Sequence, residues 1–148
     1  SWYFTGHGLN DNHRKFSIVL KKNNTINKIL FDQAEKIMES ENLKKFTKLE
    51  RSYASGYTHG TIHDLHTDDG STEYNKVFTI MFYLNKHWDV TYGGETVFVN
   101  HDKSITSILP QPGRAILFDG FIPHLARDPS RICTELRMVA TFKYGVGK

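Results

Sequence analysis

The spacing of hydrophobic positions changes along the chain. In 25–43 (TINKILFDQAEKIMESENL) apolar residues recur at steps of three, four and one, which predicts an amphipathic helix packed on another element. From residue 76, KVFTIMFYL alternates between two faces and is rich in β-branched and aromatic residues, which predicts a strand. Four similar short runs follow at 95–99, 104–109, 114–118 and 137–144. Short strands separated by turns indicate an antiparallel sandwich or barrel.

Length and composition narrow the protein class. A chain of 148 residues with 39% hydrophobic content is enough for one ordinary core, so we expect a single domain over 1–148. The net charge of +3 comes from scattered residues, which gives no support to nucleic-acid binding. The sequence has neither a membrane-length apolar run nor a signal core, so we expect a soluble, cytoplasmic protein without a membrane partner. Because the chain begins at Ser1, we leave open that it is a fragment of a longer protein with a targeting signal of its own. The sequence does not indicate the oligomeric state.

A possible metal site is spread over two segments. Cys133 is the single cysteine, which leaves His, Asp and Glu as candidate ligands. The stretch HDLHTDDG places His66 and Asp68 in an H-x-D pattern, which by itself is also compatible with a solvated turn. The run PGRAILFDGFIPH then ends in His124. Two histidines and one carboxylate form the facial triad of non-haem Fe(II) oxygenases. Asp119, at a strand end, is a weaker alternative carboxylate.

An oxygenase of this kind that used 2-oxoglutarate would need a buried cation for the distal carboxylate. Arg137 opens the last predicted strand, and its planar fork suits a bidentate carboxylate. Thr141 continues the same face of that strand. Tyr83 lies on the inward-facing side of its own strand, and its hydroxyl could donate a hydrogen bond to the same carboxylate.

Four ordered motifs resemble a known family. HTD, FYLNKHWDVTYGGET, PGRAILFDGFIPH and RMVATFKY are similar to the motifs of the Fe(II)/2-oxoglutarate-dependent dioxygenases, and within them of the prolyl 4-hydroxylase-like branch that includes the hypoxia-sensing prolyl hydroxylases. The resemblance implies a mainly β fold with flanking α: a double-stranded β-helix (jelly-roll, cupin-like) barrel over about 49–144, supported by an N-terminal helix at about 25–43.

The resemblance also implies roles for individual residues. Arg137 and Tyr83 are similar to the residues that bind 2-oxoglutarate, and a further tyrosine is expected from the strand before H-x-D, with Tyr53 preferred over Tyr57. The implied iron ligands, which are also the catalytic residues, are His66, Asp68 and His124. The remaining candidates for cosubstrate binding are Thr79 and Thr141.

The implied cofactors are Fe(II), 2-oxoglutarate and O2, with ascorbate as a further candidate. The implied reaction hydroxylates an aliphatic C–H bond, most readily of a prolyl or other peptidyl residue, and releases succinate and CO2. Asp68 favours hydroxylation over halogenation, because related halogenases lack this carboxylate. The alternatives are a hydroxylase of a free amino acid or other small molecule, a metal-binding cupin-like isomerase or silent barrel, and a small interaction protein with an incidental H-x-D.

Two features depart from the family pattern. Arg137 comes 13 positions after His124, which is a longer spacing than this branch leads us to expect. A loop insertion at ARDPSRIC would explain it, and Arg131 is the rival anchor, although it precedes the strand pattern. Lys143 continues the inward face of Arg137 at a position where the hypoxia-sensing enzymes carry an aromatic residue. The second departure means that the substrate of the hypoxia-sensing enzymes is not carried over to this chain.

Overall fold

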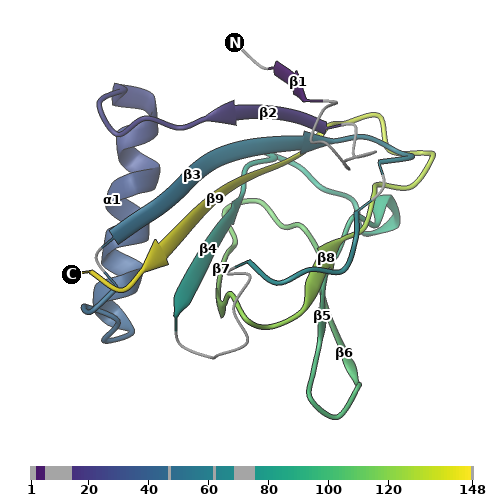
Figure 1. The fold of residues 1–148 in the computed structure, drawn as a ribbon. Helices are drawn as coiled ribbons and strands as arrows, with labels where there is room; N and C mark the ends of the chain where they lie inside the picture. The colour runs from purple at the N-terminus through teal and green to yellow at the C-terminus, as the bar shows by residue number, and fades with distance from the viewer. Residues whose placement is uncertain (1–2, 6–14, 47, 62, 69–75, 148) are drawn as a thin grey trace.

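The computed structural model describes residues 3–5, 15–46, 48–61, 63–68 and 76–147, which form two antiparallel sheets, one α-helix and one 3-10 helix (Figure 1). The larger sheet has the order β1-β2-β3-β9-β4-β7 and the smaller one the order β6-β5-β8. The elements are β1 (Tyr3–Thr5), β2 (Lys15–Val19), α1 (Thr25–Ser40), β3 (Lys48–Tyr57), β4 (Val77–Tyr83), the 3-10 helix η1 (Val90–Tyr92), β5 (Thr96–Val99), β6 (Ile105–Ile108), β7 (Ala115–Asp119), β8 (His124–Ala126) and β9 (Arg137–Gly145).

All five strands that the alternation predicts are present, with ends within one residue of the expected positions. The alternation did not predict four further described strands, namely β1, β2, β3 and β8, although the resemblance implied a strand before H-x-D, which is β3. Of these, β3 is the longest of the described strands, and it pairs with β2 on one side and with β9 on the other. Long-range pairing therefore specifies this strand more than its own hydrophobic pattern does.

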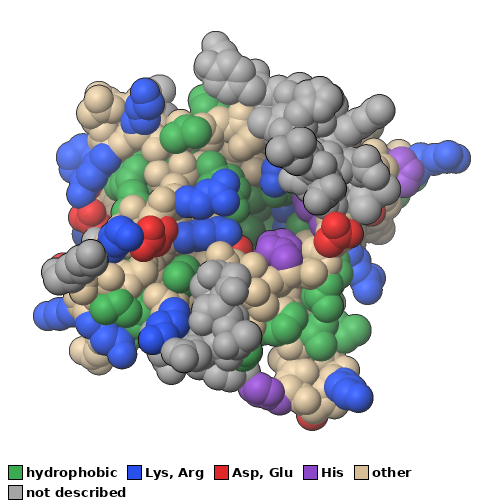
Figure 2. Space-filling view, in the orientation of Figure 1, with side chains coloured by type: hydrophobic (Ala, Val, Ile, Leu, Met, Phe, Trp, Pro, Cys, Tyr) green, Lys and Arg blue, Asp and Glu red, His purple; other side chains and the backbone are tan. Residues whose placement is uncertain are grey.

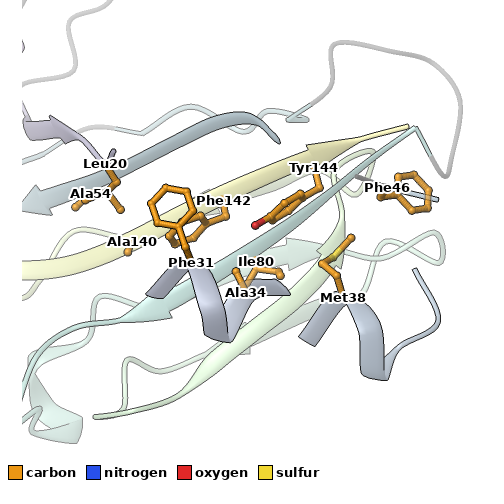
Figure 3. Close-up of a cluster of buried hydrophobic side chains, with 10 residues drawn as sticks. All are labelled: Leu20, Phe31, Ala34, Met38, Phe46, Ala54, Ile80, Ala140, Phe142 and Tyr144. Atoms are coloured by element: carbon orange, nitrogen blue, oxygen red, sulfur yellow. The ribbon is translucent and has the colours of Figure 1, made fainter. Parts of the chain in front are cut away.

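Helix α1 covers the outer face of the larger sheet. Phe31 lies edge-on against Phe142 of β9, with ring centroids 4.9 Å apart, and Ala34 and Met38 are buried in the same cluster as Ile80 of β4 (Figure 3). The helix ends at Ser40, three residues before the predicted end.

A tight turn ends the helix. Asn42 has a left-handed backbone with φ of 57°, which few residues other than glycine, asparagine and aspartate adopt readily. The Leu43 amide donates back to the Met38 carbonyl at 2.9 Å.

The inner face of the larger sheet carries most of the polar side chains that matter for function. Side chains alternate along β9, so that Phe142 faces the helix while Arg137, Thr141 and Lys143 face the smaller sheet. The pairing of β3 with β9 sets Tyr57 opposite Arg137. Across the part of the chain that the structure describes, no helix has the length and apolar character needed to cross a membrane.

Candidate active site

Two segments that are far apart in the sequence meet at the centre of the site. His66 lies between β3 and β4, His124 opens β8, and their main chains exchange two hydrogen bonds of 3.0 and 2.9 Å. The Asp68 amide donates to the Gly120 carbonyl at 2.7 Å, which fixes the loop against the end of β7. The ligating atoms of His66, Asp68 and His124 lie within 4.8 Å of one another. The structure therefore brings the three predicted ligands together.

Backbone carbonyls orient both imidazoles. His66 Nδ1 lies 2.9 Å from the Asp64 carbonyl, and His124 Nδ1 lies 2.8 Å from the Ile122 carbonyl. An Nδ1–H that donates to a carbonyl leaves the Nε2 lone pair available for a metal. Both Nε2 atoms are 3.7 Å from a carboxylate oxygen of Asp68, so both lone pairs converge on the same region.

The two histidines have different surroundings. His124 is buried against Phe98 and Phe118, with ring centroids 5.8 and 4.7 Å away. This burial lowers the pKa of His124, although the charge of Asp68 opposes the shift, and the neutral imidazole that results is the form that binds metal. The His66 side chain is 50% exposed, so the site opens to solvent on the His66 side.

Two donors from the larger sheet hold Asp68, whose side chain is only 3% exposed. Thr79 Oγ1 donates to one carboxylate oxygen at 2.6 Å, and Lys143 Nζ donates to the other. Burial would raise the pKa of Asp68, but the charge of Lys143, helped by His124, keeps it below its usual range. The carboxylate is therefore ionised and fixed in orientation near neutral pH.

A second polar site surrounds Arg137, which is fully buried. Its Nε donates to the Gly94 carbonyl at 2.5 Å and its Nη2 to Thr96 Oγ1 at 2.9 Å. The guanidinium carbon lies 5.4 Å from the Tyr57 ring centroid and 5.5 Å from that of Tyr83. Among the described residues Nη1 has no hydrogen-bond partner although it is buried. Such a donor is costly unless a ligand completes it.

The tyrosines divide between two parts of the sheet. Tyr83 lies beside Arg137, as the sequence predicted, and so does Tyr57, the alternative to Tyr53. Tyr53 pairs instead with Thr141 further along β9. The β3–β9 register, which the sequence does not show, decides which tyrosine contacts the arginine.

The rival candidates lie elsewhere. Arg131 is exposed and precedes β9, so the extra residues after His124 form a surface loop. Asp119 accepts a hydrogen bond of 2.9 Å from the Phe121 amide at the turn after β7, and the candidate metal cluster contains Asp68 in its place.

Asn85 supports Arg137 and was not identified from the sequence. Its side chain is buried, donates to the Leu136 carbonyl at 2.8 Å and accepts from the Met138 amide at 2.8 Å. These bonds fasten the end of β4 to both neighbours of Arg137. A signal was present in the motif FYLN, where a polar residue directly follows an apolar strand.

The donor atoms fit the groups that the sequence predicts. Two imidazoles and one carboxylate are a suitable ligand set for Fe(II). The unpartnered Nη1 of a buried arginine suits a carboxylate, which can accept two parallel bonds from the guanidinium.

A candidate metal triad between two antiparallel sheets, with a buried arginine on the final strand, is the arrangement expected of a non-haem Fe(II) oxygenase. A family model described as the 2OG-Fe(II) oxygenase superfamily matches residues 52–143, which is more than half of the chain. The protein therefore belongs to the 2OG-Fe(II) oxygenase superfamily. It is a 2-oxoglutarate-dependent dioxygenase that uses Fe(II), 2-oxoglutarate and O2, so the predicted enzyme class and these cofactors are confirmed, while ascorbate stays a prediction.

Solved structures of prolyl hydroxylases have a similar fold. A Pseudomonas putida prolyl-4-hydroxylase superposes with a TM-score of 0.74 at 16% identity, covering 92% of this chain and 74% of that one. A Trichoplax adhaerens prolyl hydroxylase, in complex with a hypoxia-inducible-factor oxygen degradation domain peptide fragment, gives 0.72 at 17% identity, covering 89% and 63%. A viral collagen prolyl hydroxylase from Paramecium Bursaria Chlorella virus-1 gives 0.65 at 17% identity, covering 90% and 80%.

The predicted fold class, a double-stranded β-helix with a supporting helix, is confirmed by these likenesses. The present chain spans less than two thirds of the Trichoplax protein. Among curated protein sequences, none matches the chain.

Proposed function

We propose that this protein hydroxylates an aliphatic C–H bond of a prolyl or other peptidyl residue and converts 2-oxoglutarate to succinate and CO2. Three proteins of similar fold are prolyl hydroxylases, and one of them was solved with a peptide. The family membership supplies the reaction class, and these likenesses support a peptide substrate.

The environment of Arg137 carries the proposal. A fully buried guanidinium with an unpartnered Nη1 is expected to receive an anionic group. In the proposed enzyme that group is the distal carboxylate of 2-oxoglutarate. A barrel without this cosubstrate would have little reason to bury an arginine in this way.

The residues around Arg137 prepare the site for a carboxylate. Tyr57 and Tyr83 lie against the guanidinium and keep water away from it. Burial raises the pKa of each phenol above its ordinary value, so both phenols stay neutral near pH 7. The Tyr83 hydroxyl already contacts Thr96 Oγ1 at 2.8 Å and the Ile108 carbonyl at 3.3 Å. Two neutral phenols and one cation can surround an anion without bringing in a competing negative charge.

His66, Asp68 and His124 would hold Fe(II), which when bound supplies the oxidising chemistry for both cosubstrate and substrate. His124 supplies a neutral imidazole, and Asp68 is kept ionised and fixed by Thr79 and Lys143. A carboxylate at position 68 supports hydroxylation in preference to halogenation.

The first test is the binding of 2-oxoglutarate under anaerobic conditions. Titration with Fe(II) and 2-oxoglutarate should produce the weak visible charge-transfer band of a chelated cosubstrate. We expect Arg137→Ala to weaken the binding at least tenfold, since a buried charged hydrogen bond contributes about 1.5–3 kcal/mol. Arg131→Ala, which removes an exposed arginine, is the matched control and should bind as wild type does.

The second test adds O2 and short synthetic peptides that contain proline. The expected result is succinate together with a peptide heavier by one oxygen atom. A wild-type protein that binds Fe(II) but shows no 2-oxoglutarate band would overturn the proposal in favour of a binding-only barrel. Turnover of free amino acids but of no peptide would retain the dioxygenase and overturn the peptide substrate.

A further inference from the structure

Two cations lie opposite each other beside the metal triad. Arg51 of β3 and Lys143 of β9 are direct cross-strand partners. Both approach the ring of Tyr53: the Arg51 guanidinium carbon is 5.3 Å and Lys143 Nζ is 5.9 Å from its centroid. Like charges in this arrangement destabilise a sheet unless an anion lies between or beside them.

In the structure Asp68 supplies that anion to Lys143. Asp68 is also a proposed metal ligand, so in the loaded enzyme its negative charge is shared between the metal and Lys143. The formal charges of Fe(II), Asp68, dianionic 2-oxoglutarate and Arg137 already cancel without Lys143. Because the Lys143 side chain is only 9% exposed, it then represents a buried cation in excess, which is costly unless another anion compensates it.

A groove beside the triad has room for such an anion. It has a volume of about 870 Å³, and its lining includes His66, Tyr53 and Ser17. Figure 2 shows Lys and Arg side chains gathered in the middle of this face, next to a histidine. The charged lining residues are Lys15, Glu50, Arg51, Asp64, Asp68 and Lys143.

The acids of the groove do not remove the need for an anion beside Arg51 and Lys143. Glu50 lies 2.9 Å from Lys48 Nζ in an ion pair of its own. Asp68 is assigned to the metal, and Asp64 is exposed in the loop that carries His66. Arg51 and Lys143 therefore form the cationic part of the wall closest to Tyr53.

We propose that the substrate carries a carboxylate that binds between Arg51 and Lys143, with the reacting carbon beside the triad. Building on the proposed function, this assigns the substrate class: a peptide whose hydroxylated residue is close to an Asp or Glu. The same chemistry would also fit a free amino acid or another small acid. Arg51, Lys143 and Tyr53 are then specificity-determining residues, and they face the substrate, whereas Arg137 faces the cosubstrate.

The test measures peptide binding without turnover. Fluorescent proline peptides with Glu next to the proline, and matched peptides with Gln or Lys there, are titrated anaerobically into protein loaded with Mn(II) and 2-oxoglutarate, and anisotropy is recorded. We expect the Glu peptide to bind about tenfold more tightly than the Gln peptide, as charge-assisted hydrogen bonds are the stronger ones. Arg51→Glu should reverse the order and favour the Lys peptide.

Two further variants sharpen the test. Arg131→Glu introduces the same charge change on an exposed residue outside the groove and should leave the Glu preference intact. Lys143→Met should abolish the preference, and because this buried position can affect folding, the exposed Arg51 provides the independent variant. Glutamate and other small acids are tested as competitors, together with a DNA oligonucleotide.

The outcomes separate this inference from the proposed function. A Glu preference that Arg51→Glu reverses supports the inference with a peptide substrate. If small acids bind in an Arg51-dependent way and no peptide binds, the carboxylate site between Arg51 and Lys143 is supported, and the substrate is a small acid in place of a peptide. Equal binding of all peptides by a protein that does bind 2-oxoglutarate, or Arg51-dependent binding of the oligonucleotide alone, overturns the inference. Absence of 2-oxoglutarate binding overturns the proposed function itself.

Discussion

Gly94 lies directly against Arg137. A Cβ at Gly94 would be 3.1 Å from Arg137 Cδ and 3.1 Å from a ring carbon of Trp88, and the Gly94 carbonyl accepts the Arg137 Nε bond. We therefore expect Gly94→Ala to displace the guanidinium and to weaken 2-oxoglutarate binding about tenfold or more, because a misplaced binding group loses most of its contribution. Isothermal titration of the Mn(II)-loaded protein measures this.

Gly93→Ala is the matched control for that substitution. Gly93 also has a positive φ, 64° compared with 75° for Gly94, but among the described residues a Cβ there would meet only Glu95 Oε2, at 3.8 Å. Gly94→Ala should lose about 1 kcal/mol of stability from backbone strain. Gly93, with φ of 64° and ψ of −134°, lies outside the left-handed helical region, so Gly93→Ala should lose about 1–3 kcal/mol. Equal loss of 2-oxoglutarate affinity in the two would mean that strain, and not contact with Arg137, is the cause.

Thr79 is expected to determine metal affinity through Asp68. Its hydroxyl donates to Asp68 Oδ2 at 2.6 Å, and residues that orient a ligand typically change metal affinity about 10- to 100-fold. Thr79→Val should therefore weaken Co(II) or Mn(II) binding by a factor in that range, while Thr79→Ser retains the donor and should bind nearly as well as wild type. Equal affinity of the Val and Ser variants would contradict the role of the hydroxyl.

The two candidate tyrosines can be distinguished by removing one oxygen atom from each. Tyr57 contacts the Arg137 guanidinium, whereas Tyr53 lies against Lys143. We expect Tyr57→Phe to weaken 2-oxoglutarate binding about fivefold, which corresponds to one hydrogen bond of about 1 kcal/mol. Tyr53→Phe should leave that affinity unchanged. The reverse result would restore Tyr53, the tyrosine that the sequence favoured.

Local patterns in the sequence predicted much of this fold. The alternation in β4 and β9 is clear because one face packs on α1 and the other faces the site. Strand β3 could not be found in the same way, because KLERSYASGY mixes charged, small and aromatic residues. Gly56, for example, leaves space for Leu136, whose side chain would lie 2.4 Å from a Cβ there. Such packing depends on a partner far away in the sequence.

In the candidate site, too, some features could be predicted from local sequence and others could not. His66, Asp68 and His124 could be predicted as ligands because ligand type and strand-end positions are readable from the sequence, and the structure brings the three side chains together. The partner of Lys143 and the tyrosine beside Arg137 were not, since both depend on the register of strands that are distant in the chain.

Asn85 is expected to contribute both to stability and to the position of Arg137. Asn85→Ala would leave the Leu136 carbonyl and the Met138 amide without their partner inside the protein, at a cost of about 2–4 kcal/mol. Chemical denaturation should show this loss, and 2-oxoglutarate affinity should fall with it. Asn100→Ala is the control: its bonds to Ser104 and Thr106 are exposed, so stability should change by less than about 0.5 kcal/mol.

Tyr144 provides a test of the core that does not involve the site. Among the described residues its buried hydroxyl has no hydrogen-bond partner, so Tyr144→Phe should be neutral or stabilising by up to about 1 kcal/mol near pH 7. Burial raises the pKa of Tyr144 to about 12. The unfolded chain therefore loses the phenol proton first, near pH 10, and this residue's contribution to stability falls as the pH rises from about 10 to about 12. Denaturation midpoints near pH 8 and about pH 11 should diverge in favour of the Phe variant, and a Phe variant that is clearly less stable near pH 8 would show that the hydroxyl is hydrogen-bonded after all.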